Sequence, residues 1–292
     1  MSMALLLLMA ILTLNISARE QSSDLIVSAP SSLEDVAARV RATDLSSISR
    51  ALTRAGLELP PTVRVSLVET NDPRHRDVPA WVAARASGVD TIVIYPRNIG
   101  SYPYDSLPSV VLHEIVHLAL NVRAGGRRLP RWFHEGVAVS VESGWGIGSQ
   151  ARLLLAATRD PGMDDVATLF ASEAAPETQT AYLLSAALIE DVRRRHGLAV
   201  PGAIAAGVAG GASFESAFYA ATGESVAVAA THAWRVYRGL RWLPVITSNA
   251  GLWGGIMLLA FIAFVIRLRR RRQKRWEEDE TPDPPFDENG PD

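Results

Sequence analysis

Near its middle the chain reads Ser109-Val-Val-Leu-His-Glu-Ile-Val-His-Leu-Ala-Leu120, an apolar run that encloses two histidines and one glutamate. On an α-helix, residues four apart lie one turn above each other, so the imidazoles of His113 and His117 would face the same way and could hold one metal ion. Glu114 would lie beside them, within reach of a water on that metal without binding the metal itself. Two imidazoles and a carboxylate are costly on a buried helix unless something satisfies them. The apolar setting therefore favours a metal site over a coincidental pattern.

The residues around the pentad His113-Glu-Ile-Val-His117 carry signals for the ends of a helix. Ser106 is the predicted N-cap, and Pro108 falls in the first turn, where its missing N–H costs little. Downstream, the segment from Asn121 to Arg128 contains two consecutive glycines and three arginines, which is typical of a loop. We therefore expect one buried helix that ends near this loop.

A second segment, Leu129-Pro-Arg-Trp-Phe-His-Glu-Gly-Val-Ala-Val-Ser-Val-Glu142, supplies candidates for a third metal ligand. Catalytic zinc is typically held by three protein ligands, with a fourth position open for water. Glu135 is the preferred candidate because it lies on a predicted second helix, started by Pro130, one loop away from the pentad. The small residues Gly136 and Ala138 follow it, and we expect them to let this helix approach the first one closely.

Two other side chains compete for the third position. His134 is adjacent to Glu135, so on a helix it points about 100° away, and only one of the two can face the metal. Glu142 lies two turns beyond Glu135 on the same helix face. That position suits a carboxylate that supports the site or faces solvent better than it suits a ligand.

Together the two segments resemble the gluzincin metallopeptidases, and most of all the bacterial peptidase-MA-like families, in which HExxH is followed by P-x-W-[FL]-x-E-G-x-A. The resemblance implies one Zn²⁺ ion held by His113, His117 and Glu135. It extends more loosely over Leu107 to Arg238 and leaves the N-terminal third unmatched. It also implies that a strand just ahead of the metal-bearing helix, predicted at Thr91 to Tyr95, offers an exposed edge to an extended peptide substrate.

The expected activity is zinc-dependent hydrolysis of peptide bonds in a peptide or protein. A zinc-activated water would attack the carbonyl, with Glu114 as general base. Tyr182 could donate a hydrogen bond to the developing oxyanion, or could simply pack in the core. The alternative is a catalytically inactive zinc-binding module that recognises a partner. We expect such a module to have lost the base, whereas this sequence retains Glu114. An intramembrane protease is excluded because prolines and charged residues interrupt the apolar run on both sides of the pentad.

The other histidines that we considered are His75, His196 and His232. They fall in a polar loop, at a basic helix end and on a late helix. We expect surface or capping roles for them rather than metal binding.

The N-terminal end of the chain predicts export. Residues 1–18 contain a short apolar run followed by Ile16-Ser-Ala18, which suits a cleaved signal peptide, with an uncleaved anchor as the alternative. Residues 19–241 would then form the extracytoplasmic catalytic domain.

The C-terminal end predicts a membrane anchor. Residues 242–266 are 25 uncharged residues, enough at ~1.5 Å each to cross a ~30 Å hydrocarbon core. The basic cluster that starts residues 267–292 would stay cytoplasmic, followed by a disordered acidic tail. Gly251 and Gly255 could support weak dimerisation of the span. The expected location is therefore the cell (inner) membrane, with a single pass and a cytoplasmic C-terminus.

Composition and periodicity complete the prediction. The formal net charge of −2 gives no indication of a nucleic-acid partner, and the absence of cysteine excludes disulfides, thiolate zinc sites and lipoprotein anchors. Hydrophobic spacing predicts a helix from Ser31 or Ser32 to about Ala55 and strands at Thr62–Glu69 and Thr91–Tyr95. Further helices are predicted at residues 149–158, 178–196, 213–221 and 226–238. The predicted fold class is α+β: a zincin-like domain with a small N-terminal sheet and a mostly helical C-terminal part, plus one transmembrane helix.

Overall fold

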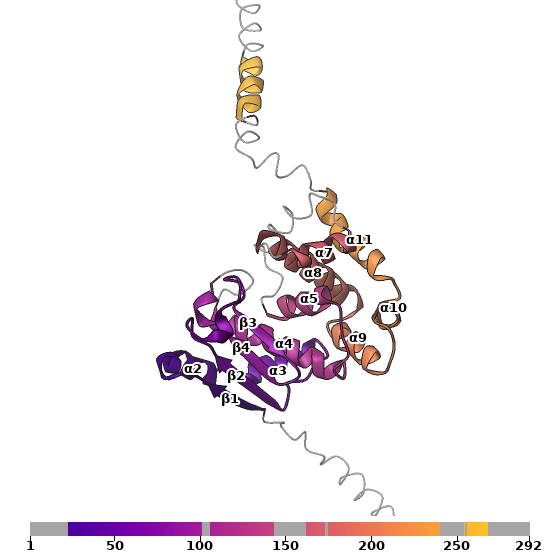
Figure 1. The fold of residues 1–292 in the computed structure, drawn as a ribbon. Helices are drawn as coiled ribbons and strands as arrows, with labels where there is room; N and C mark the ends of the chain where they lie inside the picture. Colours follow the sequence, from indigo (N-terminus) through magenta and orange to yellow (C-terminus); the bar gives the residue numbers. More distant parts are fainter. Residues whose placement is uncertain are drawn as a thin grey trace, which may run out of the picture. The chain divides into compact units, whose positions relative to one another are not determined.

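The computed structural model describes residues 23–100, 106–142, 162–172, 175–239, 254 and 256–267 (Figure 1). The chain divides into two compact units, residues 1–238 and 239–292. The first unit contains the sheet, the pentad and most of the helices. Its fold is mixed α and β, with a small sheet and a mostly helical remainder, as the sequence predicts.

A four-stranded sheet forms the N-terminal part of the first unit. Its strands, in spatial order, are β1 (Asp24–Ser28), β2 (Thr62–Leu67), β4 (Thr91–Ile94) and β3 (Ala84–Ser87). Strands β1, β2 and β4 run parallel to one another, and β3 pairs antiparallel with β4. Strand β3 is therefore an edge of the sheet.

The position of the edge corrects one expectation. The predicted strand at Thr91–Tyr95 is present as β4, but it is hydrogen-bonded on both sides, to β2 and to β3. The edge strands are β1 and β3, and β3 is the one beside β4. Its sequence Ala-Arg-Ala-Ser carries no β-branched or aromatic residue and gave no strand signal. Strand β1 was likewise not predicted.

Two helices precede β2 where the sequence pattern predicts one. They are α2 (Glu34–Arg41) and α3 (Leu45–Arg54), and a 3-10 turn, η1 (Ser31–Leu33), leads into them. The helix is interrupted between them because Asp44 caps a new one: its side chain accepts hydrogen bonds from the backbone N–H groups of Ser46 and Ser47. The prediction of a single helix to Ala55 is wrong at this cap.

Helix α4 (Leu107–Arg123) carries the pentad and packs against both β3 and β4. The Ser106 hydroxyl accepts a hydrogen bond from the Ser109 N–H, and Pro108 lies in the first turn, as predicted. Most of its residues from Leu107 to Leu120 are buried. Helix α4 therefore lies between the sheet and the helical part of the unit.

The remaining helices of the first unit form the C-terminal part. They are α5 (Arg131–Glu142), α7 (Met163–Ala171), α8 (Ala175–His196), α9 (Val200–Ala209), α10 (Phe214–Thr222) and α11 (Val226–Gly239). Helices α8, α10 and α11 were predicted with bounds close to these, whereas α7 and α9 were not predicted. The helix predicted at residues 149–158 lies outside the described residues.

Helix α5 packs on both α4 and α8. The sequence predicts that Gly136 lets α5 approach α4, but the closest neighbours of Gly136 belong to α8. A Cβ atom built at Gly136 would lie 2.6 Å from the Ser185 carbonyl oxygen and 2.8 Å from Cγ1 of Ile189. The buried Arg193 of α8 adds a second link, since its Nη1 atom donates to the Ser140 carbonyl and hydroxyl oxygens, each at 3.0 Å.

In the second unit, Gly254 and residues 256–267 are helical. No helix within the described ranges is both long enough and apolar enough to cross a membrane. The predicted transmembrane helix at 242–266 therefore has no support from the described residues and stays a prediction. Three further predictions fall outside the described residues: the signal peptide at 1–18, the glycine pair at 251 and 255, and residues 268–292 of the cytoplasmic segment.

Candidate metal centre

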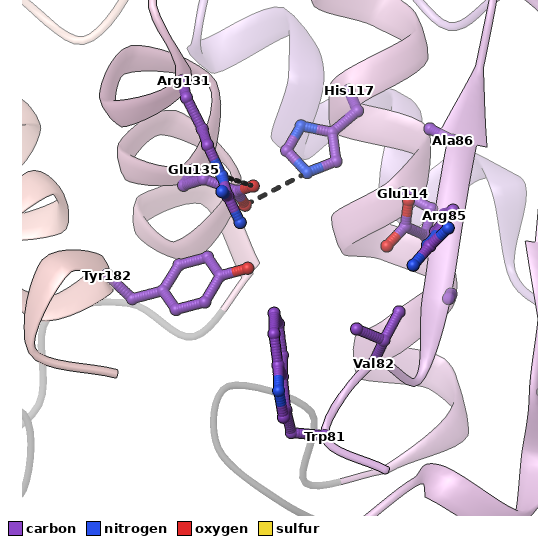
Figure 2. Close-up of a pocket in the computed structure, with 10 residues that line it drawn as sticks. Trp81, Val82, Arg85, Ala86, Glu114, His117, Arg131, Glu135 and Tyr182 are labelled. Atoms are coloured by element: carbon purple, nitrogen blue, oxygen red, sulfur yellow. Dashed lines mark ion pairs between the residues drawn. The ribbon is translucent and has the colours of Figure 1, made fainter. Parts of the chain in front are cut away.

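Helices α4, α5 and α8, strand β3 and the segment that leads into it line a cavity of about 370 Å³ (Figure 2). Figure 2 shows Glu114 and His117 of α4 on one side, and Arg131 and Glu135 of α5 with Tyr182 of α8 on the other. The full lining consists of Trp81, Val82, Ala84, Arg85, Ala86, Glu114, His117, Arg131, Glu135 and Tyr182. Four of the five predicted site residues therefore line one cavity: Glu114, His117, Glu135 and Tyr182. The fifth, His113, is not among the lining residues.

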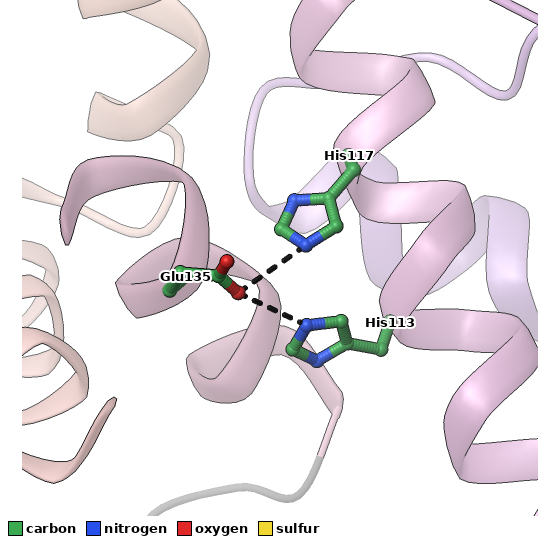
Figure 3. Close-up of side chains that lie close together, drawn as sticks. All are labelled: His113, His117 and Glu135. Carbon is green, nitrogen blue, oxygen red and sulfur yellow. Dashed lines mark hydrogen bonds and ion pairs between the residues drawn. The ribbon is translucent and has the colours of Figure 1, made fainter. Parts of the chain in front are cut away.

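His113 and His117 project from consecutive turns of α4 towards α5 (Figure 3). Their ring centroids lie 4.8 Å apart, and the ring planes are nearly perpendicular, at 85°. The His113 side chain is fully buried, and that of His117 is 14% exposed. The two rings therefore present nitrogen atoms to the same small volume.

Glu135 of α5 completes this cluster. Its Oε2 atom lies 3.3 Å from Nε2 of His113 and 3.3 Å from Nε2 of His117, and the three groups offer ligand atoms that all lie within 4.8 Å of one another. Ligand atoms at ~2.0–2.1 Å from a tetrahedral zinc ion lie about 3.4 Å apart, close to both measured separations. The cluster could hold a metal ion, and its donor set of two imidazoles and one carboxylate suits zinc.

The two competing side chains lie elsewhere. The ring centroid of His134 is 5.5 Å from that of His117, and His134 does not belong to the cluster. Burial lowers the pKa of His134 to about 4, with the nearby His117 acting in the same direction. Glu142 reaches the far side of the His113 ring, where its Oε2 atom lies 3.1 Å from Nδ1.

The contact with Glu142 orients His113. A carboxylate at Nδ1 keeps a proton on that nitrogen, so the lone pair of Nε2 would be available to a metal ion held beside Glu135. The second carboxylate oxygen of Glu142 accepts a hydrogen bond from the Ser109 hydroxyl, so the carboxylate is itself anchored to α4. The last residue of α5 therefore fixes the geometry of the first histidine of the pentad.

The carboxylates act strongly on the buried imidazole. Burial alone would lower the pKa of His113, but hydrogen bonds to Glu135 and Glu142 raise it to about 10. Burial would raise the pKa of Glu135, and the charges and hydrogen bonds of His117 and His113 hold it well below its ordinary value. The cluster thus stabilises positive charge between its side chains, whether that charge is a proton or a metal cation.

Glu114 lies on the opposite wall of the cavity from Glu135. Burial raises the pKa of its carboxyl group, partly offset by His117, His113 and a hydrogen bond from the backbone N–H of Ala86 in β3. Its Oε2 atom is buried and has no hydrogen-bond partner among the described residues. Since an unpaired buried carboxylate oxygen is costly, this atom is suited to bind a water or substrate group in the cavity.

Tyr182 points its hydroxyl into the cavity from α8 (Figure 2). The residue is 3% exposed, and its ring contacts Phe170 edge-on at a centroid distance of 5.6 Å. The ring of His113 lies further away, at 6.5 Å. The tyrosine therefore combines a packed ring with a polar group at the cavity wall, as both of its expected roles require.

No role was predicted from the sequence for three cavity residues with charged or large aromatic side chains, Trp81, Arg85 and Arg131. Trp81 and Arg85 belong to the segment around the unpredicted strand β3. Arg131 had a usable signal, because it lies four residues before Glu135 and a helix places both on one face. It also lines a second, adjoining cavity of about 310 Å³ together with His117, His134 and Glu135.

The other histidines lie away from the cluster. His196 and His232 both contact Glu224, with nitrogen–oxygen distances of 3.3 Å and 3.2 Å. His75 packs edge-on against Tyr95 at 5.2 Å. None of the three belongs to the group of described side chains that could hold a metal ion.

Comparison with protein-family models, with curated proteins and with solved structures found no match to this chain. The functional argument therefore rests on the residues and geometry described above.

Proposed function

We propose that this chain is a zinc-dependent metallopeptidase of the gluzincin type. The observation that carries the proposal is the position of the Glu135 Oε2 atom, 3.3 Å from the Nε2 atoms of both pentad histidines. His113, His117 and Glu135 would hold one zinc ion. When bound, zinc acts as a Lewis acid that activates a water and polarises a carbonyl group.

The protein's own residues would perform the proton transfers and the positioning. Glu114 would take a proton from the attacking water and pass it to the leaving amine, for which its raised pKa is suited. Tyr182 would donate a hydrogen bond to the oxygen of the substrate carbonyl as negative charge develops there. The edge strand β3 lines the same cavity and would hold the substrate backbone by strand addition.

The alternative is an inactive zinc-binding module that recognises a partner. Such a module has no need for a buried carboxylate oxygen that faces the cavity without a partner, and Glu114 supplies one. This observation favours the enzyme. Export and anchoring by a single membrane span remain part of the proposal and rest on the sequence alone.

The test combines metal analysis with cleavage of a peptide library by the full chain. We expect one zinc ion per chain and cleavage in the unaltered protein, retained zinc without cleavage in Glu114→Gln, and loss of zinc in His117→Ala. Normal cleavage by Glu114→Gln would remove Glu114 as the base. Zinc binding without cleavage of any peptide by the unaltered protein would favour the inactive module.

A further inference from the structure

The charged residues around the cavity leave an excess of positive charge. The cavity is lined by two carboxylates, of Glu114 and Glu135, and by two arginines, Arg85 and Arg131. A divalent cation held as proposed would offset both carboxylates, while the ligand His117 would be neutral. The Glu142 carboxylate behind His113 then balances one of the two arginine charges, and the net positive charge that remains favours binding of an anionic group.

Arg131 is held in a fixed position at the first residue of α5. Its Nη1 atom donates to the Phe170 carbonyl oxygen at 2.9 Å, and its guanidinium carbon lies 4.8 Å from the centroid of the Phe170 ring. Its side chain is nevertheless 51% exposed. Among the described residues its Nη2 atom has no acceptor. An anchored guanidinium with a free donor edge is suited to bind a carboxylate.

An ion pair with Glu135 does not account for Arg131. The Nε atom of Arg131 lies 3.9 Å from Oε1 of Glu135, which is too long for a hydrogen bond. The other carboxylate oxygen of Glu135, Oε2, is the one that faces the histidines. Arg131 therefore keeps its charge available to a ligand beside the metal cluster.

Arg85 supplies a second cation on the opposite wall. It lies on the edge strand β3, is exposed, and has no ion-pair partner among the described residues. Figure 2 shows Arg85 on the side of Glu114 and Arg131 on the side of Glu135, with Trp81 between the two walls. A peptide lying along β3 would pass between these cations.

We infer that the cavity selects peptides that carry a carboxylate next to the bond to be cleaved, and that Arg131 binds this carboxylate. The group is either a C-terminal α-carboxylate or the side chain of Asp or Glu, which present the same chemistry. The inference rests on the proposed peptidase function and specifies its substrate class.

The test uses four matched peptides with the zinc-loaded full chain. They carry Glu or Gln next to the cleaved bond, and each ends either in a free carboxylate or in an amide. We expect kcat/KM to be about tenfold higher for a peptide with a carboxylate than for its neutral match, the ratio expected of one partly exposed charge-assisted hydrogen bond. Preference for Glu over Gln identifies the side chain as the source, and preference for the free terminus identifies the α-carboxylate.

Substitutions assign the preference to a residue. Arg131→Gln should reduce the ratio to about one, and Arg131→Lys, which keeps the charge, should retain part of it. Arg128→Gln removes the same charge from an exposed loop position outside the cavity and should leave the ratio unchanged. Arg85→Gln tests the opposite wall separately. If the kcat/KM ratio falls to about one in Arg85→Gln but is unchanged in Arg131→Gln, the assignment to Arg131 is overturned.

Binding provides a readout that does not depend on turnover. Affinities of the same four peptides are measured by fluorescence anisotropy for Glu114→Gln and for the double variant Glu114→Gln/Arg131→Gln. The inference is supported if the carboxylate peptides bind more tightly than the neutral ones to Glu114→Gln but not to the double variant. This result would stand even if no peptide were cleaved and the peptidase proposal failed. Equal cleavage and equal binding of charged and neutral peptides would overturn the inference while leaving the peptidase proposal intact.

Discussion

The Nδ1 atom of His113 lies 3.1 Å from the carboxylate of Glu142, while the Nε2 atom of the same ring lies 3.3 Å from the carboxylate of Glu135. Both glutamates belong to α5 and are seven residues apart, so they lie two turns apart on one face of that helix. Helix α5 thus supplies both Glu135, a candidate metal ligand, and Glu142, which orients the His113 ring. The arrangement makes the register of α5 against α4 a determinant of the site.

The contact between Glu142 and His113 predicts a loss of metal affinity on substitution. Glu142→Gln should weaken zinc binding by about 10- to 100-fold, the usual effect of removing the group that orients a metal-bound histidine. The protein should remain folded. Competition with a chelating dye measures the change, and Glu177→Gln, an exposed substitution early in α8, is the matched control. Unchanged affinity in Glu142→Gln would show that the contact does not orient the ring.

The close approach of α5 to α8 predicts that Gly136→Ala is destabilising. Helix propensity alone favours alanine by about 1 kcal/mol, so the sign of the change is informative. The added methyl group would meet the Ser185 carbonyl oxygen at 2.6 Å, and backbone must shift to admit it. We expect overpacking to cost about 1–3 kcal/mol and to displace Glu135, with a lower Tm and weaker zinc binding. A rise in Tm would contradict the packing described for Gly136.

The metal cluster could be predicted because its signals are local. The spacing of His113 and His117 within one helix fixes their common direction, and Ser106 and Pro108 mark the start of that helix. Predicting Glu135 as a candidate ligand required only that a second helix follow a short loop. The sequence could not decide between Glu135 and its rivals from the residues alone, because that choice depends on how α5 is rotated against α4.

The cavity around the cluster depends on contacts between distant parts of the chain. Strand β3 exists through its pairing with β4, in which Ala84 lies opposite Ile94, and its four residues have little strand propensity of their own. The roles of Arg85 and Trp81 could not be predicted without that strand. Gly136 was recognised as a site of close packing, but composition does not say which neighbour it faces, and the partner proved to be α8.

Metal removal should lower the stability of the first unit, since a ligand that binds only the folded state stabilises it. At a free zinc concentration of 100 times Kd, the gain is about 2.7 kcal/mol. For a domain of this size that corresponds to a rise in Tm of about 5–10 °C. Thermal unfolding with zinc and with a chelator measures the difference. It should vanish in His117→Ala, and an equal shift in that variant would place the bound zinc elsewhere.

Glu224 connects the end of α8 to α11 and predicts a pH-dependent contribution to stability. Its carboxylate is within ion-pair distance of Arg195, His196 and His232, and its side chain is 12% exposed. Burial raises the pKa of Glu224, but the hydrogen bond and charge of Arg195 outweigh it and hold the pKa below the ordinary value of 4.5. Because the pKa of Glu224 is lower in the folded state, its ionised carboxylate stabilises the fold at pH values above the pKa of the unfolded state. This stabilisation is lost as the pH falls through the pKa of the folded state.

Glu224→Gln should therefore destabilise the protein at about pH 5, and the destabilisation should shrink as the pH is lowered from there to about pH 3, because the unaltered protein loses the same stabilisation as its carboxylate becomes protonated. Solvent screening limits the expected loss to about 1 kcal/mol, or about 2–4 °C in Tm. Thermal unfolding of the two proteins at both pH values measures the difference. Glu58→Gln, at an exposed position outside the helices and strands, serves as the control for lost charge. A destabilisation of equal size at both pH values would mean that packing of the Glu224 side chain, rather than its charge, holds α8 to α11.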